Sequence, residues 1–430
     1  MRYYLDPFGC VKNQVDAETM MAHLNGAAWL ATDKPEDADL IIINSCGFIE
    51  SAKRESINAV LAWRKLFPDK KLILAGCLAQ RYAGEIELAE ADCLFGNNDL
   101  AQITEVASRL TGSAVTGTPV VPGQRPLLSL PGSAYIKISE GCNNRCSFCA
   151  IPLIRGPLHS RPILDIVEEC RQLIARGIRE LCLIGQDIGS FGKSANNSAD
   201  SQLPALLEAI ARLDGRFWVR LLYIHPDHFP LDILDTISRD NRFLPYFDIP
   251  FQHGSTAILR AMNRQGNAES YHNLIQRIRD ALPDAALRST FLLGFPGETS
   301  ADFQALLDFQ AEARLDWVGC FTYSREENTP AYSMKNRIPK RLAIERKAIV
   351  EERQTPISEK RMERFVGRRL DALVEEAIDS EEGLYLGRLF CQAPEVDGAT
   401  VITSDTRLAV GDFVTGKIVA RAGIDLDMRV

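Results

Sequence analysis

The chain has 430 residues and a formal net charge of −8. A chain of this length predicts about three domains, and its acidic balance argues against a nucleic-acid footprint spread over the whole surface. Apolar runs such as 40–43 and 291–294 are far shorter than the ~20 residues of a membrane span, and residues 1–6 lack the pattern of a signal peptide. We therefore expect a cytoplasmic protein with reduced thiols and no membrane partner.

The first part of the chain, residues 1–111, alternates short apolar strands with amphipathic helices. Strands are predicted over 2–5, 40–43 and 72–75, and helices over 15–24, 49–67 and 79–91. Because each strand is followed by a helix, this order predicts a flavodoxin-like α/β domain with a parallel sheet.

Cysteines follow each of these three strands, at Cys10, Cys46 and Cys77. The carboxyl ends of parallel strands meet at one edge of a sheet, where ligands collect. A single buried cysteine is common and needs no function. Three of them at the same place in consecutive strand–helix units favour a three-thiolate iron–sulfur site, for which Cys93 at the next strand is the one competing ligand.

A longer series of strands and helices occupies residues 133–365, after a linker at 112–132 that is rich in glycine and proline. Its strands are predicted over 134–138, 180–184, 218–223, 246–250, 287–293 and 317–323. Six such units predict a partial (β/α)6 barrel, with the active residues at the carboxyl ends of the strands.

The loop after the first barrel strand carries Cys142, Cys146 and Cys149 in the spacing C-x3-C-x2-C. Three thiols can hold three corners of a cubane cluster and leave one iron open, since such clusters otherwise take four thiolates. A zinc site is the alternative, but it needs a fourth ligand and only His159 is near. A disulfide framework is disfavoured in a chain of this length without a secretory signal. The spacing therefore favours an open 4Fe–4S cluster.

Later strands of the barrel are also followed by polar and glycine-rich stretches, at 185–187, 225–227, 252–255 and 294–299. Glycine allows backbone amides to approach a ligand closely, and Gln, Asp and His can bond a polar cofactor. A single residue such as His253 is more commonly structural. The joint position of these stretches is what points to a binding site.

The last part of the chain combines a basic helical segment with a small β domain. Residues 335–369 hold twelve Lys or Arg against five Asp or Glu. A solvated helix face is the default interpretation, and a docking strip for an RNA-containing partner is the alternative.

Residues 366–430 predict a small antiparallel β-barrel of the OB-like kind. Its strands are expected over 370–374, 384–390, 400–403, 408–409 and 413–420, with turns at 382–383, 397–398 and 411–412. This part holds seven Lys or Arg and twelve Asp or Glu, a net of −5. An acidic surface repels phosphates, so a protein partner is favoured.

These motifs carry a resemblance. The cysteine loop after the first strand of a partial barrel is similar to that of the radical S-adenosylmethionine (SAM) superfamily. The whole chain resembles the methylthiotransferases, through GCVKN at 9–13, EGC at 140–142 and GFPGET at 294–299. That family has an amino-terminal cluster domain, a radical SAM domain and a terminal TRAM domain, which implies domains at 1–111, 133–365 and 366–430.

The resemblance implies that Cys142, Cys146 and Cys149 hold a 4Fe–4S cluster that binds SAM. Phe148 would lie near the adenine and Gln186 would contact the methionine part. Cleavage of SAM would give a 5′-deoxyadenosyl radical, which can attack a C–H bond that no side-chain base could deprotonate. No side chain is assigned as a catalytic acid or base.

The resemblance further implies a second, auxiliary 4Fe–4S cluster on Cys10, Cys46 and Cys77, whose open iron carries the sulfur to be inserted. SAM would then be both methyl donor and radical source. The segments 9–16, 149–156 and 246–253 look most like the branch that methylthiolates the β-carbon of an aspartate in protein twelve of the small ribosomal subunit.

The implied partners are that ribosomal protein, free or in the ribosome, and an external electron donor such as a flavodoxin, with direct nucleic-acid binding secondary. The close rival is a tRNA adenosine methylthiotransferase of the MiaB kind, against which the acidic terminal barrel argues. A rival from another class is an iron–sulfur electron-transfer or scaffold protein without catalysis.

Overall fold

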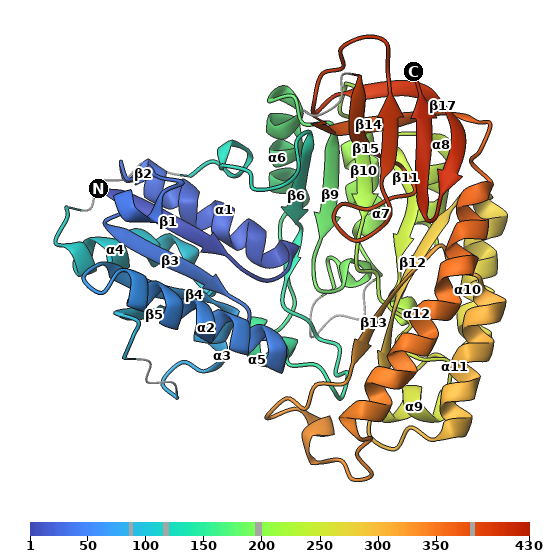
Figure 1. Cartoon of the computed structure of the whole chain (residues 1–430), viewed down its shortest axis with the longest axis horizontal. Helices are drawn as coiled ribbons and strands as arrows, with labels where there is room; N and C mark the ends of the chain where they lie inside the picture. Colours follow the sequence, from blue (N-terminus) through green and yellow to red (C-terminus); the bar gives the residue numbers. More distant parts are fainter. Residues whose placement is uncertain (86–88, 115–119, 194–199, 379–382) are drawn as a thin grey trace.

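Three structural units follow one another along the chain in this computed structural model, which describes residues 1–85, 89–114, 120–193, 200–378 and 383–430 (Figure 1). The first unit is a parallel sheet in the order β2-β1-β3-β4-β5, which confirms the predicted flavodoxin-like fold. Its strands are β1 (Arg2–Pro7), β2 (Leu30–Ala31), β3 (Leu40–Ser45), β4 (Lys71–Gly76) and β5 (Cys93–Phe95). Its helices are α1 (Val11–Gly26), α2 (Glu50–Leu66), α3 (Cys77–Arg81) and α4 (Ile103–Thr111).

Helices cover both faces of this sheet. Ile42 and Ile73 pack with α1 and α4 on one face, and Ile43 and Leu74 pack with α2 and α3 on the other. Burial on both faces explains why the central strands are continuous apolar runs rather than alternating ones.

One helix of the first unit is shorter than predicted. The helix expected over 79–91 is α3, which begins at Cys77 and ends at Arg81. The chain then passes through Gly84 with φ of +80°, a left-handed conformation that does not continue an α-helix. Residues 86–88 of the predicted helix lie outside the described residues.

The second unit is a parallel sheet of six strands in sequence order, with β6 and β13 at its two edges, so the barrel is open as predicted. Its strands are β6 (Ser133–Lys137), β9 (Glu180–Ile184), β10 (Trp218–Leu221), β11 (Phe243–Asp248), β12 (Ala286–Leu293) and β13 (Trp317–Thr322). The helices that alternate with them are α6 (Ile163–Ala175), α7 (Leu203–Ala211), α8 (Ile233–Arg239), α10 (Ala268–Ala281), α11 (Ser300–Ala313) and α12 (Lys340–Glu363).

Short elements shape the loops at the carboxyl ends of the barrel strands. The cysteine loop lies between β7 (Ser139–Glu140) and α5 (Ile151–Arg155), and β7 pairs with β8 (His159–Ser160). The loop after β11 leads into α9 (Thr256–Ala261).

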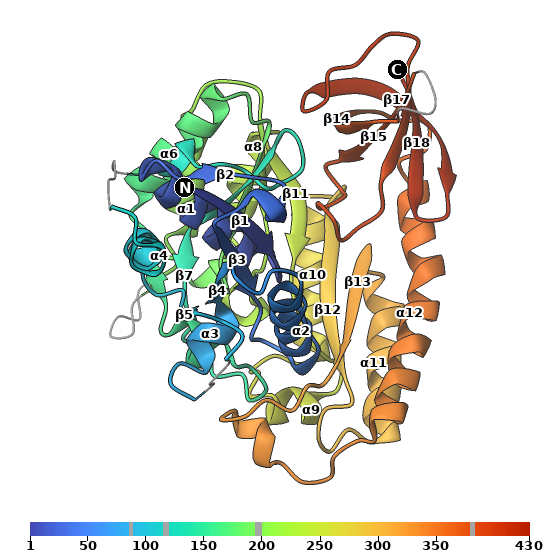
Figure 2. The same ribbon diagram turned by 60° about the vertical axis from the view of Figure 1, so that its left-hand side comes forward.

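The third unit is a closed barrel in the order β14-β15-β16-β18-β17, at the carboxyl end of α12 (Figure 2). Its strands are β14 (Arg369–Ala377), β15 (Leu384–Leu389), β16 (Thr400–Thr403), β17 (Phe413–Ala422) and β18 (Asp425–Arg429). Four of its pairings are antiparallel, whereas β16 and β18 run parallel.

The strand predicted at 408–409 was wrong, and the fifth strand is β18 instead. The Leu408 amide donates to the side-chain hydroxyl of Tyr385 on β15 and not to a backbone carbonyl of that strand. The turn predicted at 382–383 lies partly outside the described residues. No helix in the described part of the chain is long and apolar enough to cross a membrane.

The third unit is joined to the second through a buried ion network. Glu180 of β9 accepts from Arg220 of β10 at 2.7 Å and from Arg388 of β15 at 2.5 Å. All three side chains are buried, and the two guanidinium groups outweigh the effect of burial and lower the pKa of Glu180 to about 2.

Replacing Glu180 by alanine is expected to lower the free energy of unfolding by about 3–5 kcal/mol, because two buried guanidinium groups would lose their shared carboxylate. Urea unfolding followed by circular dichroism measures the change. Glu376→Ala, an exposed carboxylate on β14, is the matched control and should leave stability unchanged. Equal unfolding curves for the two variants would contradict the structural role of the network.

Candidate active site

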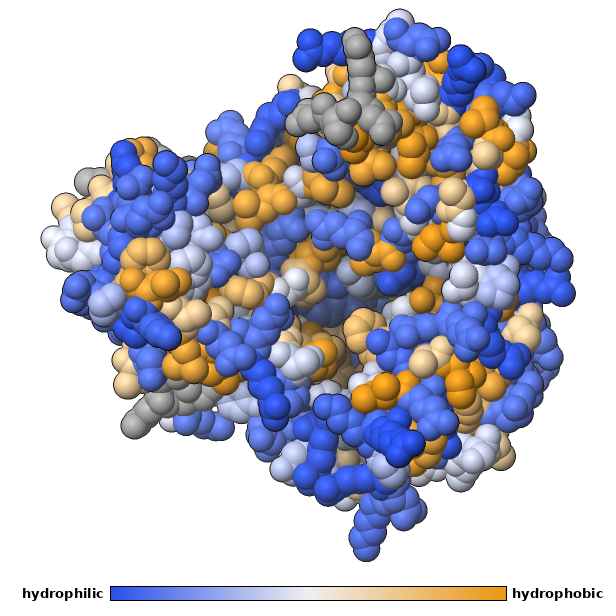
Figure 3. Space-filling model, in the orientation of Figure 1, coloured by the Kyte–Doolittle hydropathy of each residue, from blue (hydrophilic) through white to orange (hydrophobic). Residues whose placement is uncertain are grey.

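One cavity of about 380 Å³ lies where the first unit meets the carboxyl ends of the barrel strands. Figure 3 shows the surface hollowed between these two units. The cavity is lined by all eight residues that the sequence predicted for the site: Cys10, Cys46, Cys77, Cys142, Cys146, Cys149, Phe148 and Gln186. The structure therefore brings both cysteine trios onto the same cavity.

The amino-terminal trio lies at three neighbouring strand ends. Cys10 precedes α1, Cys46 follows β3, and Cys77 is the first residue of α3. The sulfur of Cys77 is 3.1 Å from Nη2 of Arg155 and 3.0 Å from Oδ1 of Asn13. Burial raises the pKa of the Cys77 thiol to about 12. Since a metal ligand must be the thiolate, this thiol would need a strong positive charge nearby to lose its proton, and iron bound at the site would supply it.

The second trio lies on a loop that is fixed to its surroundings. The backbone amide of Ser147 donates to the Met262 carbonyl at 3.0 Å, and Nδ2 of Asn144 donates to Asp187 at 2.9 Å. Burial raises the pKa of Cys142 to about 11 and that of Cys149 to about 12. The loop thus presents three thiols to the cavity without a fourth from its own sequence.

The donor set fits two iron–sulfur clusters. Each trio offers three thiols, and the cationic side chains of Lys12, Arg155 and Arg264 line the same cavity, where they can offset the negative charge of thiolate-bound clusters. Among the described residues, no three His, Cys, Asp or Glu side chains are arranged to hold a single metal ion. His159, the fourth ligand that the zinc alternative requires, is exposed on β8.

Two other cysteines lie elsewhere. Cys93, the competing ligand, is on β5 with its thiol 3.4 Å from the Leu94 carbonyl, and it is not part of the described lining of the cavity. Cys170, the next cysteine along the chain after Cys149, is buried in the core on α6.

An ion network of largely buried side chains joins the unit that carries the first trio to the unit that carries the second. Arg155, at the end of α5, pairs with Asp16 of α1 at 2.8 Å and with Glu140 of β7 at 3.0 Å. Lys137 of β6 pairs with both of these carboxylates. Lys137 and Arg155 outweigh the effect of burial and lower the pKa of Glu140 to about 2. The first unit is thereby fixed to the barrel next to the cysteines.

Several cavity residues were not predicted individually from the sequence. Lys12 lies over the ring of Tyr223, with Nζ 2.8 Å from the ring centroid, and burial lowers its pKa to about 8. Arg264 is buried, and its Nε has no hydrogen-bond partner among the described residues. The polar strand-end stretches signalled Gln252 and His225 as a group, and both line the cavity.

His253, in contrast, packs in the protein interior beside the turn that follows β12. Its ring is fully buried, with Nε2 3.7 Å from Glu298. The Glu298 carboxylate accepts from the amides of Gly294 and Phe295, so it fixes the turn that follows β12.

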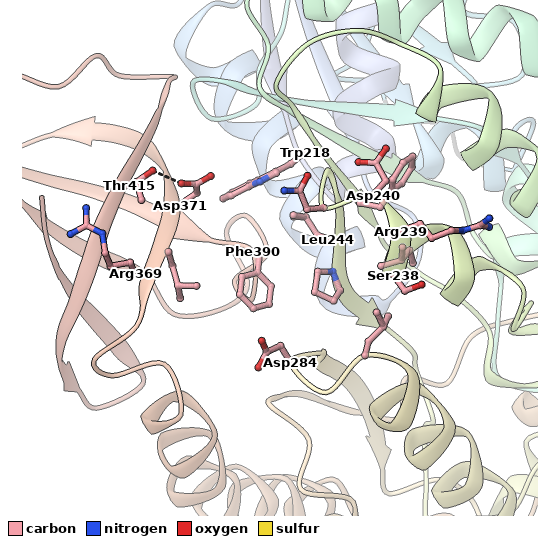
Figure 4. A pocket seen from close by; sticks show the side chains of 16 residues that line it. Trp218, Ser238, Arg239, Asp240, Leu244, Asp284, Arg369, Asp371, Phe390 and Thr415 are labelled. Atoms are coloured by element: carbon pink, nitrogen blue, oxygen red, sulfur yellow. Dashed lines mark hydrogen bonds between the residues drawn. The ribbon is translucent and has the colours of Figure 1, made fainter.

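A larger cavity of about 920 Å³ lies between the second and third units (Figure 4). It is bordered by Trp218 and Leu244, at the amino ends of β10 and β11, which is the end of the barrel away from the cysteines. Its carboxylates are paired: Asp240 with Arg242, Asp284 with Arg368, and Asp371 with Arg216. Size alone therefore does not identify the active site.

Comparisons with known proteins agree with this architecture. Family models match at residues 2–96 (Uncharacterized protein family UPF0004), 136–309 (Radical SAM superfamily) and 366–430 (TRAM domain). A structure of the radical S-adenosylmethionine methyltransferase TsrM from Kitasatospora setae has a TM-score of 0.54 at 14% identity, and the match covers 77% of this chain and 74% of that one. This likeness concerns the fold.

Two relatives are similar over nearly their whole length, and both are named ribosomal protein uS12 methylthiotransferase RimO. The protein from Treponema denticola is 45% identical, over 98% of this chain and 99% of its own. The protein from Syntrophomonas wolfei is 40% identical, over 97% of each chain. With its three matched domains and its two cysteine trios on one cavity, the chain belongs to the RimO family of radical SAM methylthiotransferases.

Proposed function

We propose that this enzyme adds a methylthio group to the β-carbon of an aspartate in ribosomal protein uS12, with two 4Fe–4S clusters and SAM. The name that both relatives carry supports the substrate and the reaction, and the family resemblance supports the aspartate. The observation that carries the proposal is that two trios of thiols, from two different domains, line one cavity. A single-cluster enzyme would have no use for the second trio.

Cys142, Cys146 and Cys149 would hold one cluster, and Cys10, Cys46 and Cys77 the other. When bound, the first cluster supplies the electron that cleaves SAM, which gives a radical able to attack an unactivated C–H bond. The chain must then keep SAM oriented and hold the two cluster sites in a fixed position relative to each other. The ion network around Arg155 fixes that relative position, because it links α1 to β6 and α5.

Polar atoms without partners in the cavity suit the amino-acid end of SAM. The free Nε of buried Arg264 would donate to the carboxylate. Gln186 donates through Nε2 to Glu140 at 2.7 Å, and its buried Oε1 has no partner in the described part of the chain, so it could accept from the ammonium group. Phe148, whose ring lies edge-on to Phe295 at 6.5 Å, would pack against the adenine.

The surface around the site suits the proposed macromolecular partners. A cavity of about 550 Å³ reaches Cys142 and is bordered by Arg145 and Lys193, which would attract an acidic electron donor such as a flavodoxin. The acidic terminal barrel suits a basic ribosomal protein and opposes a tRNA substrate.

Mass spectrometry of ribosomal proteins from cells with and without this gene tests the proposal. We expect one peptide of uS12 to lose a methylthio group when the gene is deleted and to regain it on complementation. Nucleosides from tRNA of the same cells are the internal comparison and should not change. A change in tRNA with uS12 unaltered would show a tRNA methylthiotransferase instead.

A further inference from the structure

The basic segment at 335–369 falls into two parts in the structure. In its carboxyl part, arginines pair with carboxylates of the barrel: Arg346 with Glu298, Arg361 and Arg364 with Asp316, and Arg368 with Asp284. These charges stabilise the fold. They are not available to a partner.

The amino part of the segment differs. Lys335, Arg337, Lys340 and Arg341 are all exposed, and none of them pairs with a carboxylate in the described part of the chain. Four cations within seven residues, without an intervening acid, leave an uncompensated positive charge at the start of α12.

Two of these cations, Arg337 and Lys340, border a cavity of about 420 Å³ between α2 and the end of β13. We call it the basic cleft, after its four cationic lining residues, Arg54, Arg325, Arg337 and Lys340. Glu50 is the one carboxylate in its described lining, and it is already bonded to Lys53 and Arg54. The hydroxyl of Tyr323 in the lining is buried without a hydrogen-bond partner among the described residues. Because Arg54 is bonded to Glu50, the cleft offers an anion the cations of Arg325, Arg337 and Lys340 beside the Tyr323 hydroxyl.

The basic cleft lies directly beside the active-site cavity. Phe48 and Phe321 line the active site, and the next residue after each, Ile49 and Thr322, lines the cleft. Phe321 is 53% exposed, so the stretch of chain between the two cavities is open to solvent. A macromolecule that inserts a loop into the active site would lay its neighbouring surface across the cleft.

We propose that the basic cleft binds phosphates of RNA next to the substrate loop, so that the enzyme acts on uS12 within an RNA-containing ribosomal particle. This inference rests on the proposed function. Arginine and lysine without acidic neighbours are the usual phosphate ligands of RNA-binding surfaces. The acidic terminal barrel would then contact basic ribosomal protein, and the basic cleft would contact RNA of the same particle.

An acidic protein such as the electron donor is the competing occupant of the cleft. The cavity bordered by Arg145 and Lys193 suits that donor better, because it reaches Cys142 itself. The basic cleft is instead lined by residues of α2, β13 and α12 and contains no cysteine in its described lining. Its place beside the mouth of the active site fits the substrate particle.

The double variant Arg337→Gln/Lys340→Gln tests the inference in the full-length, cluster-loaded enzyme. Arg353→Gln/Lys360→Gln is the matched control, because it removes two exposed cations farther along α12 that form no ion pair within the described residues but follow glutamates in the sequence. Co-sedimentation with purified small ribosomal subunits over a KCl series measures affinity. We expect the test variant to bind about tenfold more weakly, with the slope of log affinity against log salt reduced by about 1.5 to 2. The control variant should match the wild type.

Modification of a synthetic peptide that carries the target aspartate separates this inference from the proposed function. We expect both variants to modify the peptide like the wild type, since the peptide has no RNA. The inference would be overturned if the test variant kept the wild-type affinity and salt slope for the subunit. It would also be overturned if the test variant bound the subunit normally but lost peptide modification or reduction by flavodoxin. Absence of peptide and subunit modification by the wild type would refute the proposed function, while sedimentation would still report on the cleft.

Discussion

Replacing Cys149 by alanine is expected to reduce the formation of 5′-deoxyadenosine from SAM by at least about a hundredfold, because the remaining two thiols cannot hold the cluster that binds SAM. Iron per chain after anaerobic reconstitution should fall from about eight to about four, since the amino-terminal trio is unchanged. Liquid chromatography measures 5′-deoxyadenosine after dithionite reduction. Iron analysis provides a readout that does not depend on activity.

Cys93→Ala is the matched control for this result. Cys93 is half-buried like Cys149, but it lies on β5 and away from the active-site cavity. The control should keep about eight iron atoms and full cleavage of SAM. If Cys149→Ala retained full cleavage, the ligand set proposed here would be incorrect. If both variants lost iron equally, the loss would reflect general damage to the fold.

The convergence of the cysteines could be predicted from the sequence because it follows from topology. Parallel strands joined by helices end at the same edge of a sheet, so Cys10, Cys46 and Cys77 had to meet once the strands were recognised. The spacing of Cys142 to Cys149 is local and needs no fold at all. Only the position of each trio at the end of a strand depends on the fold, and the apolar runs reveal those strands.

The position of one trio relative to the other could not be predicted. It depends on Arg155 contacting Asp16, two residues far apart in the sequence and in different domains. Nothing in either local sequence distinguishes this pair from ordinary surface charges. The place of Lys12 in the cavity could not be predicted for the same reason, since the Tyr223 ring that it contacts belongs to the loop after β10.

Two errors had local causes. Leu426 and Met428 alternate with polar residues and are buried in β18, so the pattern of a strand was present at the chain end but was not used. The pair at 408–409 was too short for its pattern to mean anything. The basic segment at 335–369 shows a further limit, because composition cannot separate arginines that pair within the fold from those that remain free.

The second large effect is expected from Cys46→Ala, which should separate the two halves of the proposed reaction. Formation of 5′-deoxyadenosine should persist at a rate within about threefold of the wild type, because Cys142, Cys146 and Cys149 are intact. The methylthiolated peptide should fall by at least about a hundredfold, because two thiols cannot hold the auxiliary cluster that would present the sulfur. Iron per chain should again fall from about eight to about four.

Measuring both products in one reaction makes this prediction decisive. Cys46 is half-buried, and its backbone amide donates to the Ser56 hydroxyl at 3.0 Å. Substitution by alanine keeps this backbone hydrogen bond. The variant therefore changes the thiol alone. Methylthiolated peptide at the wild-type level would show that one cluster suffices. Loss of both products would show that the two sites are coupled through the Arg155 network, because damage at Cys46 would then have reached the barrel. Uncoupled cleavage of SAM is the result that assigns radical formation to one trio and sulfur insertion to the other.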